Sequence, residues 1–152
     1  MHTVGFSRRA AADAALDESL PLNPLHAALA RADAVVVAIA LTDGTRRLMN
    51  GPALAACKRG ALIVNIARGG IIDQPALIEA LESGQIGAAG LDVTNPEPMP
   101  ADDPLWHAPN VLIAPHFGGS GSAASIKRLA RGVTDNLTRL TTGQALLHIV
   151  PK

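Results

Sequence analysis

The stretch Ala61-Leu62-Ile63-Val64-Asn65-Ile66-Ala67-Arg68-Gly69-Gly70 decides how this chain is interpreted. Residues 61–66 are apolar except for Asn65, show no alternation of polar and apolar positions, and include several β-branched side chains. Such a run is typical of a parallel β-strand that is covered on both faces. The run stops at an arginine followed by two glycines, so we expect a buried strand whose carboxyl end carries Arg68.

The carboxyl end of a parallel strand is a place where ligands bind. In an open α/β sheet these ends line the crevice that holds the ligand. Arg68 can donate two hydrogen bonds to a carboxylate there, and Gly69 and Gly70 allow the backbone to approach a ligand closely. The alternative interpretation is a solvated loop arginine after an ordinary strand, and this stretch alone does not decide between the two.

Composition limits the classes of function. The 152 residues suit one domain, and 13 basic residues balance 13 acidic ones. With one tryptophan, two phenylalanines and no basic face, we expect no nucleic-acid partner and no membrane partner. Cys57 is the single cysteine, which excludes a disulfide framework and a thiolate metal cluster, so we expect it to be a packing residue and expect no metal site. No apolar signal segment follows the first residues, so a cytoplasmic protein is expected.

Strand-like and helix-like segments alternate along the chain. The expected strands are 2–6, 34–41, 61–66, 88–93 and 110–114, with a short extended piece or turn at 20–24. The expected helices are 24–32, 52–58, 73–84 and 122–140, with Asp73 as a helix N-cap and Gly60 and Gly84 closing the second and third of them. This alternation predicts an α/β fold with a doubly wound parallel sheet.

Three of the expected strands end near side chains that carry chemistry. Arg68, Glu97 and His116 follow strands of one parallel sheet, whose carboxyl ends open on one edge. A carboxylate beside an imidazole raises the imidazole pKa, which suits a general acid or base near neutral pH. The alternatives are a solvated Glu97 in a proline-rich loop and a core histidine at 116, and position alone leaves these open.

Six short motifs follow one another in a distinctive order. They are Asn65-Ile66-Ala67-Arg68-Gly69-Gly70-Ile71-Ile72-Asp73, Gly90-Leu91-Asp92-Val93, Pro96-Glu97-Pro98-Met99-Pro100, Pro104-Leu105-Trp106, Pro109-Asn110-Val111 and Pro115-His116-Phe117-Gly118-Gly119. In this order and spacing the chain resembles the NAD(P)-binding domain of the D-isomer-specific 2-hydroxyacid dehydrogenases, and more narrowly the glyoxylate/hydroxypyruvate reductases. The resemblance implies a Rossmann-like fold.

The resemblance also implies roles for individual residues. Arg68 would bind the carboxylate and carbonyl of a small 2-oxo acid, His116 would donate a proton to the carbonyl oxygen, and Glu97 would hold His116 protonated. The residues that the resemblance places along the cofactor are Ala40, Leu41, Thr45, Ile66, Ala67, Arg68, Asp92, His116 and Gly118. A homodimer is a further implication.

The segment Ser7-Arg8-Arg9 indicates which dinucleotide is preferred. An acidic residue at the end of the second strand of such a fold accepts hydrogen bonds from the ribose of NAD, whereas arginine accommodates the 2′-phosphate of NADP. Residues 7–9 include no acid and two arginines, so we expect NADP to be preferred and NAD to remain possible. The alternative is a solvated basic turn.

One expected part of the fold is absent from the sequence. No G-x-G-x-x-G motif occurs, and the first strand-like segment, 2–6, resembles the second strand of the family. We therefore expect a partial NAD(P)-binding domain over 1–141 that lacks the first strand and the Gly-rich loop, and a C-terminal segment over 142–152 that returns towards an absent substrate domain. The strands on either side of the missing one would lose their partner.

Three hypotheses about function follow. The first is an NADP-linked reductase of small 2-oxo acids, with glyoxylate or hydroxypyruvate as substrate and little activity from this chain alone. The second is a regulatory relative that binds the dinucleotide without turnover, and the presence of Arg68, Glu97 and His116 together argues against it. The third is a gene fragment without a function of its own.

Overall fold

A computed structural model describes all residues except 8–14, 22–24, 120–121 and 150–152. The chain divides into two compact units, Met1–Pro115 and His116–Lys152, and each is described by itself. The domain boundary expected near residue 141 falls inside the second unit and stays a prediction.

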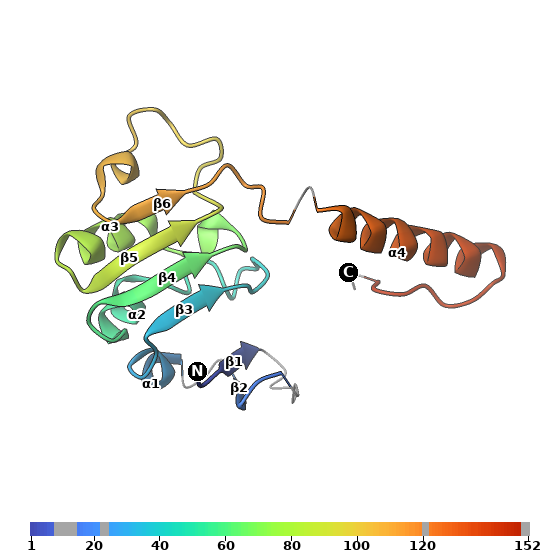
Figure 1. The fold of residues 1–152 in the computed structure, drawn as a ribbon, viewed down its shortest axis with the longest axis horizontal. Helices are drawn as coiled ribbons and strands as arrows, with labels where there is room; N and C mark the ends of the chain where they lie inside the picture. The colour runs from blue at the N-terminus through green and yellow to red at the C-terminus, as the bar shows by residue number, and fades with distance from the viewer. Residues whose placement is uncertain (8–14, 22–24, 120–121, 150–152) are drawn as a thin grey trace. The chain divides into compact units, whose positions relative to one another are not determined.

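The first unit is built around a four-stranded parallel sheet with strand order β3-β4-β5-β6 (Figure 1). Its strands are β3 (Ala34–Val37), β4 (Ala61–Asn65), β5 (Ile86–Leu91) and β6 (Val111–Ile113). Every pairing in the sheet is parallel, and β4 lies between β3 and β5. The prediction of an α/β fold with a parallel sheet is confirmed.

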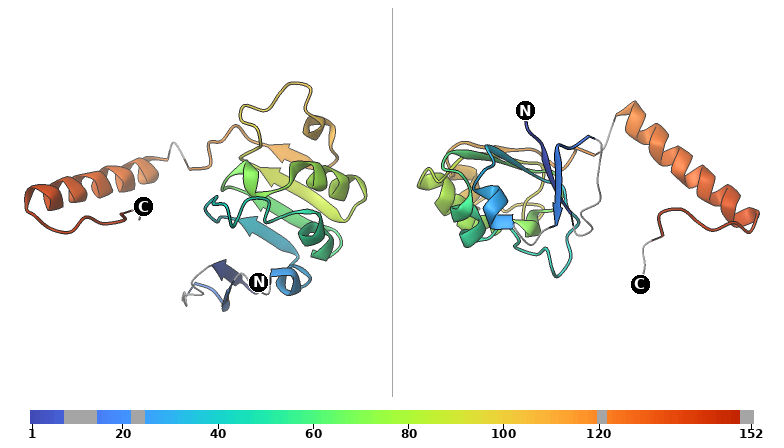
Figure 2. Two further views of the ribbon diagram at one scale, coloured as in Figure 1. Left: turned by 180° about the vertical axis from the view of Figure 1, so that it is seen from behind. Right: turned by 90° about the horizontal axis from the view of Figure 1, so that it is seen from below.

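Three helices cover one face of this sheet. They are α1 (Leu25–Leu29), α2 (Gly51–Ala56) and α3 (Gln74–Glu82), and the two further views place them on the same side of the strands (Figure 2). α2 begins at Asn50, whose side chain accepts a hydrogen bond from Ala53 N at 3.0 Å. Gly60 and Gly84 have φ values of 79° and 68°, which fits the expected chain reversals after α2 and α3.

The hydrophobic core lies between these helices and the covered face. Side chains from β4 (Ile63), α2 (Leu54), α3 (Leu77) and the short helix η2 (Pro104–His107) are almost fully buried there. The β4 residues alternate between buried and accessible positions, because residues 61, 63 and 65 point into this core.

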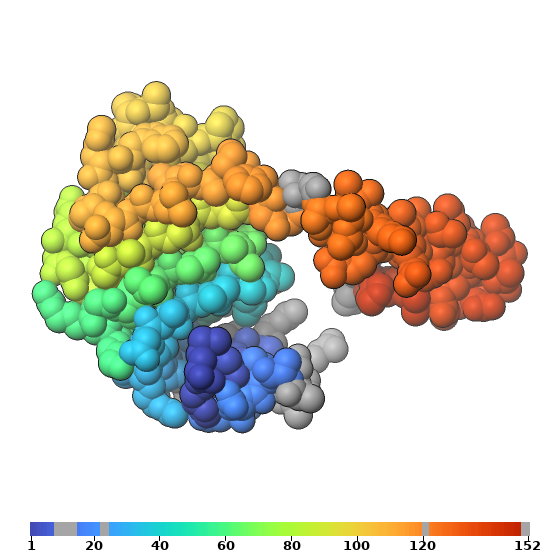
Figure 3. Space-filling model, in the orientation of Figure 1, coloured from blue at the N-terminus to red at the C-terminus, as the bar shows by residue number. Residues whose placement is uncertain are grey.

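The opposite face of the sheet exposes aliphatic side chains. Val36, Leu62 and Leu112 are 60%, 48% and 74% exposed. The strand register places their side chains on the same face of the sheet as those of Val64 and Ala88. This face is turned towards the viewer in Figure 3, where residues of the four strands form its surface. A hollow of about 630 Å³ lies over it. The expectation that β4 is covered on both faces is therefore not met within the described part of the first unit, where all three helices lie on one side.

A second, two-stranded sheet precedes the larger one. β1 (Val4–Ser7) and β2 (Glu18–Pro21) pair in parallel, so the piece expected at 20–24 is a strand that begins earlier. Among the described residues, β1 pairs only with β2 and β3 pairs only with β4. Two unpaired strand edges were expected, and in the described residues one edge of β1 and one edge of β3 have no strand partner.

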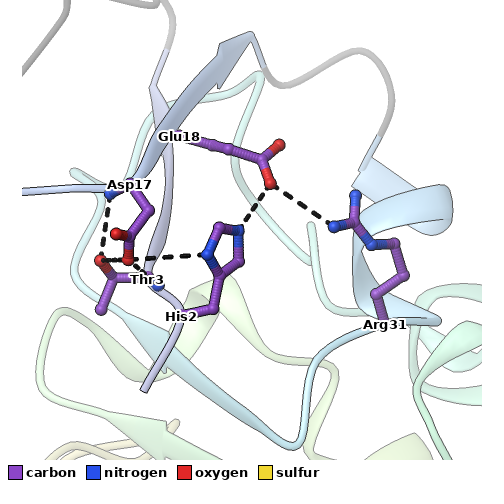
Figure 4. A network of polar contacts seen from close by, with 5 residues as sticks. All are labelled: His2, Thr3, Asp17, Glu18 and Arg31. Carbon is purple, nitrogen blue, oxygen red and sulfur yellow. Dashed lines mark hydrogen bonds and ion pairs between the residues drawn. The ribbon is translucent and has the colours of Figure 1, made fainter.

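A polar network joins the residues just before β1 to the start of β2 and to the segment after α1 (Figure 4). Asp17 Oδ2 accepts hydrogen bonds from Thr3 N and Thr3 Oγ1, both at 2.7 Å, and these bonds hold the pKa of Asp17 below its ordinary value. Glu18 Oε1 lies 2.7 Å from His2 Nε2 and 3.4 Å from Arg31 Nη2. The hydrogen bond with His2 is the main cause that lowers the pKa of Glu18.

Two expectations about element ends need correction. The strand expected over 34–41 ends at Val37, because its partner β4 ends at Asn65 and the last bond between them runs from Ile66 N to Val37 O. Asp73 occupies the N-cap position of α3, but its side chain accepts no capping hydrogen bond. Pro75 follows in the first turn and has no N–H to donate to it.

The second unit contains one long helix, α4 (Ala123–Thr141). Ser122 caps it by accepting a hydrogen bond from Ser125 N at 3.0 Å. Its apolar stripe of Ile126, Leu129, Val133, Leu137 and Leu140 is exposed. In the described part of the chain, no helix combines the length and apolar character needed to cross a membrane.

Candidate functional site

The carboxyl end of β4 is held in shape by the side chain of Asn65. Asn65 is 1% exposed, donates from Nδ2 to the Arg68 carbonyl oxygen at 3.0 Å, and accepts at Oδ1 from Ala67 N at 3.0 Å. Its backbone carbonyl accepts from Asp92 N at 3.0 Å. A buried amide with both ends hydrogen-bonded fixes the turn after the strand, so Arg68 leaves the sheet at a defined place.

Arg68 is exposed at this place. Its Nη1 donates to the carbonyl oxygen of Ala67 at 2.7 Å, which folds the guanidinium back over the turn. A guanidinium has five N–H donors, so it can engage an incoming carboxylate while keeping this bond. The expectation of an arginine at the carboxyl end of β4 agrees with the structure.

The loop after β5 carries Glu97. Thr94 N donates to Glu97 Oε1 at 2.9 Å, and Thr94 Oγ1 donates to the Pro96 carbonyl oxygen at 3.0 Å. These bonds close residues 94–97 into a tight loop that presents an exposed Glu97. Asp92, which lies just past the end of β5, is half-buried.

The Arg68 turn and the Glu97 loop are in direct contact. A Cβ added to Gly69 would overlap the carbonyl group of Thr94, so only glycine allows the two backbones to lie this close. A cavity of about 10 Å³ remains beneath them, which is room for about one water molecule. The two predicted catalytic residues of the first unit therefore sit on neighbouring loops.

The loop after β3 packs beside the same turn. Thr45 is 3% exposed, donates from Oγ1 to the Ala40 carbonyl oxygen at 2.7 Å, and accepts from Thr42 N at 2.8 Å. Its side chain therefore shapes the loop from inside. Leu41 is half-buried and packs against the turn, since its Cδ2 would lie 3.4 Å from a Cβ added to Gly70. Ala40 is exposed.

Two apolar residues complete this edge of the sheet. Ile66 is 54% exposed directly after β4, and Ala67 is half-buried. With Ala40 they give the edge an uncharged surface beside the Arg68 guanidinium.

The other expected cofactor residues are placed only in part. Ser7 is exposed at the end of β1, whereas Arg8 and Arg9 lie outside the described residues. His116 and Gly118 belong to the second unit, and both are exposed. His116 has φ 54°, in the left-handed region that residues other than glycine seldom adopt and that is often found at functional positions.

Sequence reasoning missed residues that act through hydrogen bonds. Asn65 was visible as the one polar residue in an apolar strand, which is a usable signal for a side chain that organises a turn. Thr94 showed no such signal, because its role depends on the fold of its own loop. Among the described residues, no group of three or more His, Cys, Asp and Glu side chains is arranged to hold a metal ion.

Comparisons with known proteins show the family to which the chain is related. Residues 1–118 match the family model described as D-isomer specific 2-hydroxyacid dehydrogenase, NAD binding domain. The chain is 40% identical over 119 residues to the glyoxylate/hydroxypyruvate reductase B of Serratia proteamaculans, covering 78% of this chain and 36% of that protein. It is 38% identical over 123 residues to the formate dehydrogenase, chloroplastic/mitochondrial, of Arabidopsis thaliana, covering 81% of this chain and 32% of that protein.

A solved structure shows the same fold. The D-isomer specific 2-hydroxyacid dehydrogenase of Xanthobacter autotrophicus Py2, in complex with NADPH and MES, is 38% identical and superposes with a TM-score of 0.85. The match covers 97% of this chain and 60% of that one, so this chain spans only part of the length of these relatives. By its sequence match and its fold, the chain belongs to the D-isomer-specific 2-hydroxyacid dehydrogenase family and carries sequence of the family's NAD-binding domain.

Proposed function

We propose that this chain supplies the catalytic residues of an NADP(H)-linked reductase of small 2-oxo acids, with glyoxylate or hydroxypyruvate as substrate. The observation that carries the proposal is the exposed Arg68 guanidinium at the end of β4, on a turn that buried Asn65 holds in place. The similarity to the Serratia glyoxylate/hydroxypyruvate reductase supports the choice of substrate.

Arg68 is the substrate-binding residue in this proposal. A guanidinium binds the carboxylate of a 2-oxo acid through two parallel hydrogen bonds, which also orients the neighbouring carbonyl group. The exposed edge formed by Ile66 and Ala40 keeps other charges away from the reacting carbon. Removing the guanidinium should therefore weaken substrate binding more than dinucleotide binding.

Glu97 and His116 handle the proton. In the proposal, the Glu97 carboxylate stabilises a protonated His116 imidazole, which donates its proton to the carbonyl oxygen of the substrate. NADPH, when bound, supplies the hydride that reduces the carbonyl carbon. The oxygen gains the proton and the carbon gains the hydride, so the product is a 2-hydroxy acid.

The preference for NADP(H) rests on residues 7–9. Ser7 ends β1, and the two arginines that follow carry the charge that a 2′-phosphate requires. The Xanthobacter relative was crystallised with NADPH, which supports the proposal. Equal affinities for NADPH and NADH would contradict it.

A fluorescence titration with NADPH and, separately, NADH tests the cofactor, and a turnover screen with glyoxylate, hydroxypyruvate and formate tests the reaction. Among the described residues, β1 and β3 each pair with a neighbouring strand on one side only. We therefore expect weak NADPH binding and little turnover by this chain alone. A micromolar dissociation constant or better would contradict that expectation.

The His116→Ala variant tests the proposed proton donor. Where turnover is measurable, this variant should lower kcat by about 100-fold or more and leave NADPH binding intact. Unchanged turnover would refute the role of His116. Turnover of formate and of neither 2-oxo acid would refute the proposed substrate class.

A further inference from the structure

Gln74 joins two segments that are far apart in the sequence. It is the first residue of α3 and is half-buried. Its Nε2 donates to both carboxylate oxygens of Asp103 at 3.1 Å, and its Oε1 accepts from Asn95 N at 3.2 Å. One amide group therefore uses its donor end and its acceptor end at the same time.

The orientation of this amide is determined by charge. Turning it over would place Oε1 against the Asp103 carboxylate and the NH₂ group against the Asn95 N–H, so both contacts would become repulsive. Asp103 is itself anchored, because its Oδ1 accepts from Leu105 N at 2.9 Å and Leu105 is 0% exposed. Asp103 thus holds the NH₂ group of Gln74 on the side of the core, and Gln74 Oε1 therefore faces Asn95 N.

The segment that Gln74 holds is the loop of Glu97. Asn95 directly follows Thr94, whose N–H donates to Glu97 Oε1 at 2.9 Å. A bond at Asn95 N limits rotation of the peptide group between Thr94 and Asn95. The Thr94 N–H belongs to the preceding peptide group, so the bond at Asn95 N holds it by limiting displacement of the loop backbone at residues 94 and 95.

We propose that Gln74 is a positioning residue for Glu97, acting through the backbone of Asn95 and Thr94. The catalytic meaning of this role rests on the proposed function, in which Glu97 acts on the proton donor. The structural link from Asp103 through Gln74 to the Glu97 loop is independent of the reaction.

Only glutamine can make this bridge as it stands. Glutamate could still accept from Asn95 N, but it would set a second carboxylate against Asp103. Leucine would make neither bond. The double variant Gln74→Glu/Asp103→Asn exchanges the donor and the acceptor in the contact between positions 74 and 103. The hydrogen bond is restored, since the new amide at 103 can donate to the new carboxylate at 74. An amide oxygen at position 103 can also still cap Leu105 N.

Amide hydrogen exchange of the full 152-residue chain, measured by NMR, tests the link. Gln74→Leu should speed exchange at Thr94 and Asn95 by about fivefold to tenfold, as expected for one lost hydrogen bond. Gln74→Glu should do the same, because repulsion from the Asp103 carboxylate would push the new carboxylate away from Asn95 N. Exchange at Ile63 in β4 serves as the internal control and should stay unchanged. The Gln74→Glu/Asp103→Asn chain should return the exchange rates at Thr94 and Asn95 to within about threefold of the original.

Three results would overturn the proposal. They are unchanged exchange at Thr94 in Gln74→Glu, equal acceleration at Thr94 and Ile63, and no recovery in the double variant. The second result would indicate general destabilisation in place of positioning.

Kinetics separate this proposal from the proposed function. Where turnover is measurable, Gln74→Glu should lower kcat for glyoxylate with little change in the KM for NADPH, and the double variant should recover kcat. Turnover of formate and of neither 2-oxo acid would count against the proposed function, and the exchange data would still decide the role of Gln74.

Discussion

Replacing Asn65 with alanine removes the two side-chain hydrogen bonds that shape the turn before Arg68. Ala67 N would lose its acceptor in a half-buried position, and the Arg68 carbonyl would lose its donor. A buried polar group left unsatisfied costs about 1–3 kcal/mol, and the cost is smaller where water can reach the group. Because Arg68 is exposed and Ala67 is only half-buried, we expect the free energy of unfolding of the first unit to fall by about 2 kcal/mol.

Urea unfolding followed by tryptophan fluorescence measures this loss. Trp106 is the single tryptophan and lies in the first unit, so its signal reports on that unit and not on α4. With a slope of about 2 kcal/mol/M, the midpoint for Asn65→Ala should shift by about 1 M. Exchange at the Ala67 amide should accelerate at the same time, since the N–H loses its bond.

Asn50→Ala is the matched control. Asn50 caps α2 by accepting from Ala53 N, and loss of such a cap costs about 1 kcal/mol. It should leave exchange at Ala67 unchanged. A midpoint shift below about 0.3 M for Asn65→Ala, or unchanged exchange at Ala67, would refute the argument that Asn65 holds the turn.

Three further outcomes are expected in the first unit. Gly69→Ala should destabilise it by about 1–3 kcal/mol in the same urea assay, because the added Cβ would overlap the Thr94 carbonyl. In an NMR titration, the carboxyls of Asp17 and Glu18 should show pKa values below 3.8 and 4.5 respectively. Their contribution to the β1–β2 pairing is therefore complete above pH 4.5 and is lost as the pH falls through the folded-state pKa values. Cys57 should react with a disulfide reagent much more slowly in the folded chain than in urea, since it is 5% exposed and burial raises its pKa.

Each of these outcomes has its own check. Gly44→Ala should change stability by less than about 0.5 kcal/mol, because the nearest atom to its added Cβ is Thr42 Oγ1 at 4.0 Å. Thr3→Val should raise the pKa of Asp17 towards 3.8, and a pKa that does not move would contradict the role of the Thr3 hydroxyl. A Cys57 thiol that reacts equally fast in the folded and unfolded chain would contradict its burial.

Local patterns predicted the elements well where those patterns are strong. The apolar run before Arg68 predicts a strand over 61–66, and β4 spans Ala61–Asn65. Gly84 predicts the reversal after α3, which its positive φ produces. The strand expected over 34–41 was too long, because a strand ends where its neighbour stops pairing, and a single segment does not contain that information.

The positions of Arg68 and Glu97 in the fold could be predicted from the sequence, whereas the residues that hydrogen-bond around them could not. Arg68 and Glu97 follow strands of one parallel sheet, and topology alone predicts that such residues lie near one edge. Gln74 bonds to Asn95 and Asp103, which are 21 and 29 residues away in the sequence. Contacts of that range depend on how the loops pack, so no local pattern indicates them.

The exposed face of the β3–β6 sheet affects how the folding of this chain can be followed. Val36, Leu62 and Leu112 form an aliphatic surface in the folded first unit. Dyes such as 1-anilinonaphthalene-8-sulfonate fluoresce on such surfaces, and their binding is commonly taken to mark loosely packed states. The native chain should already bind the dye, so a positive dye signal would not show that the packing of this protein has been lost.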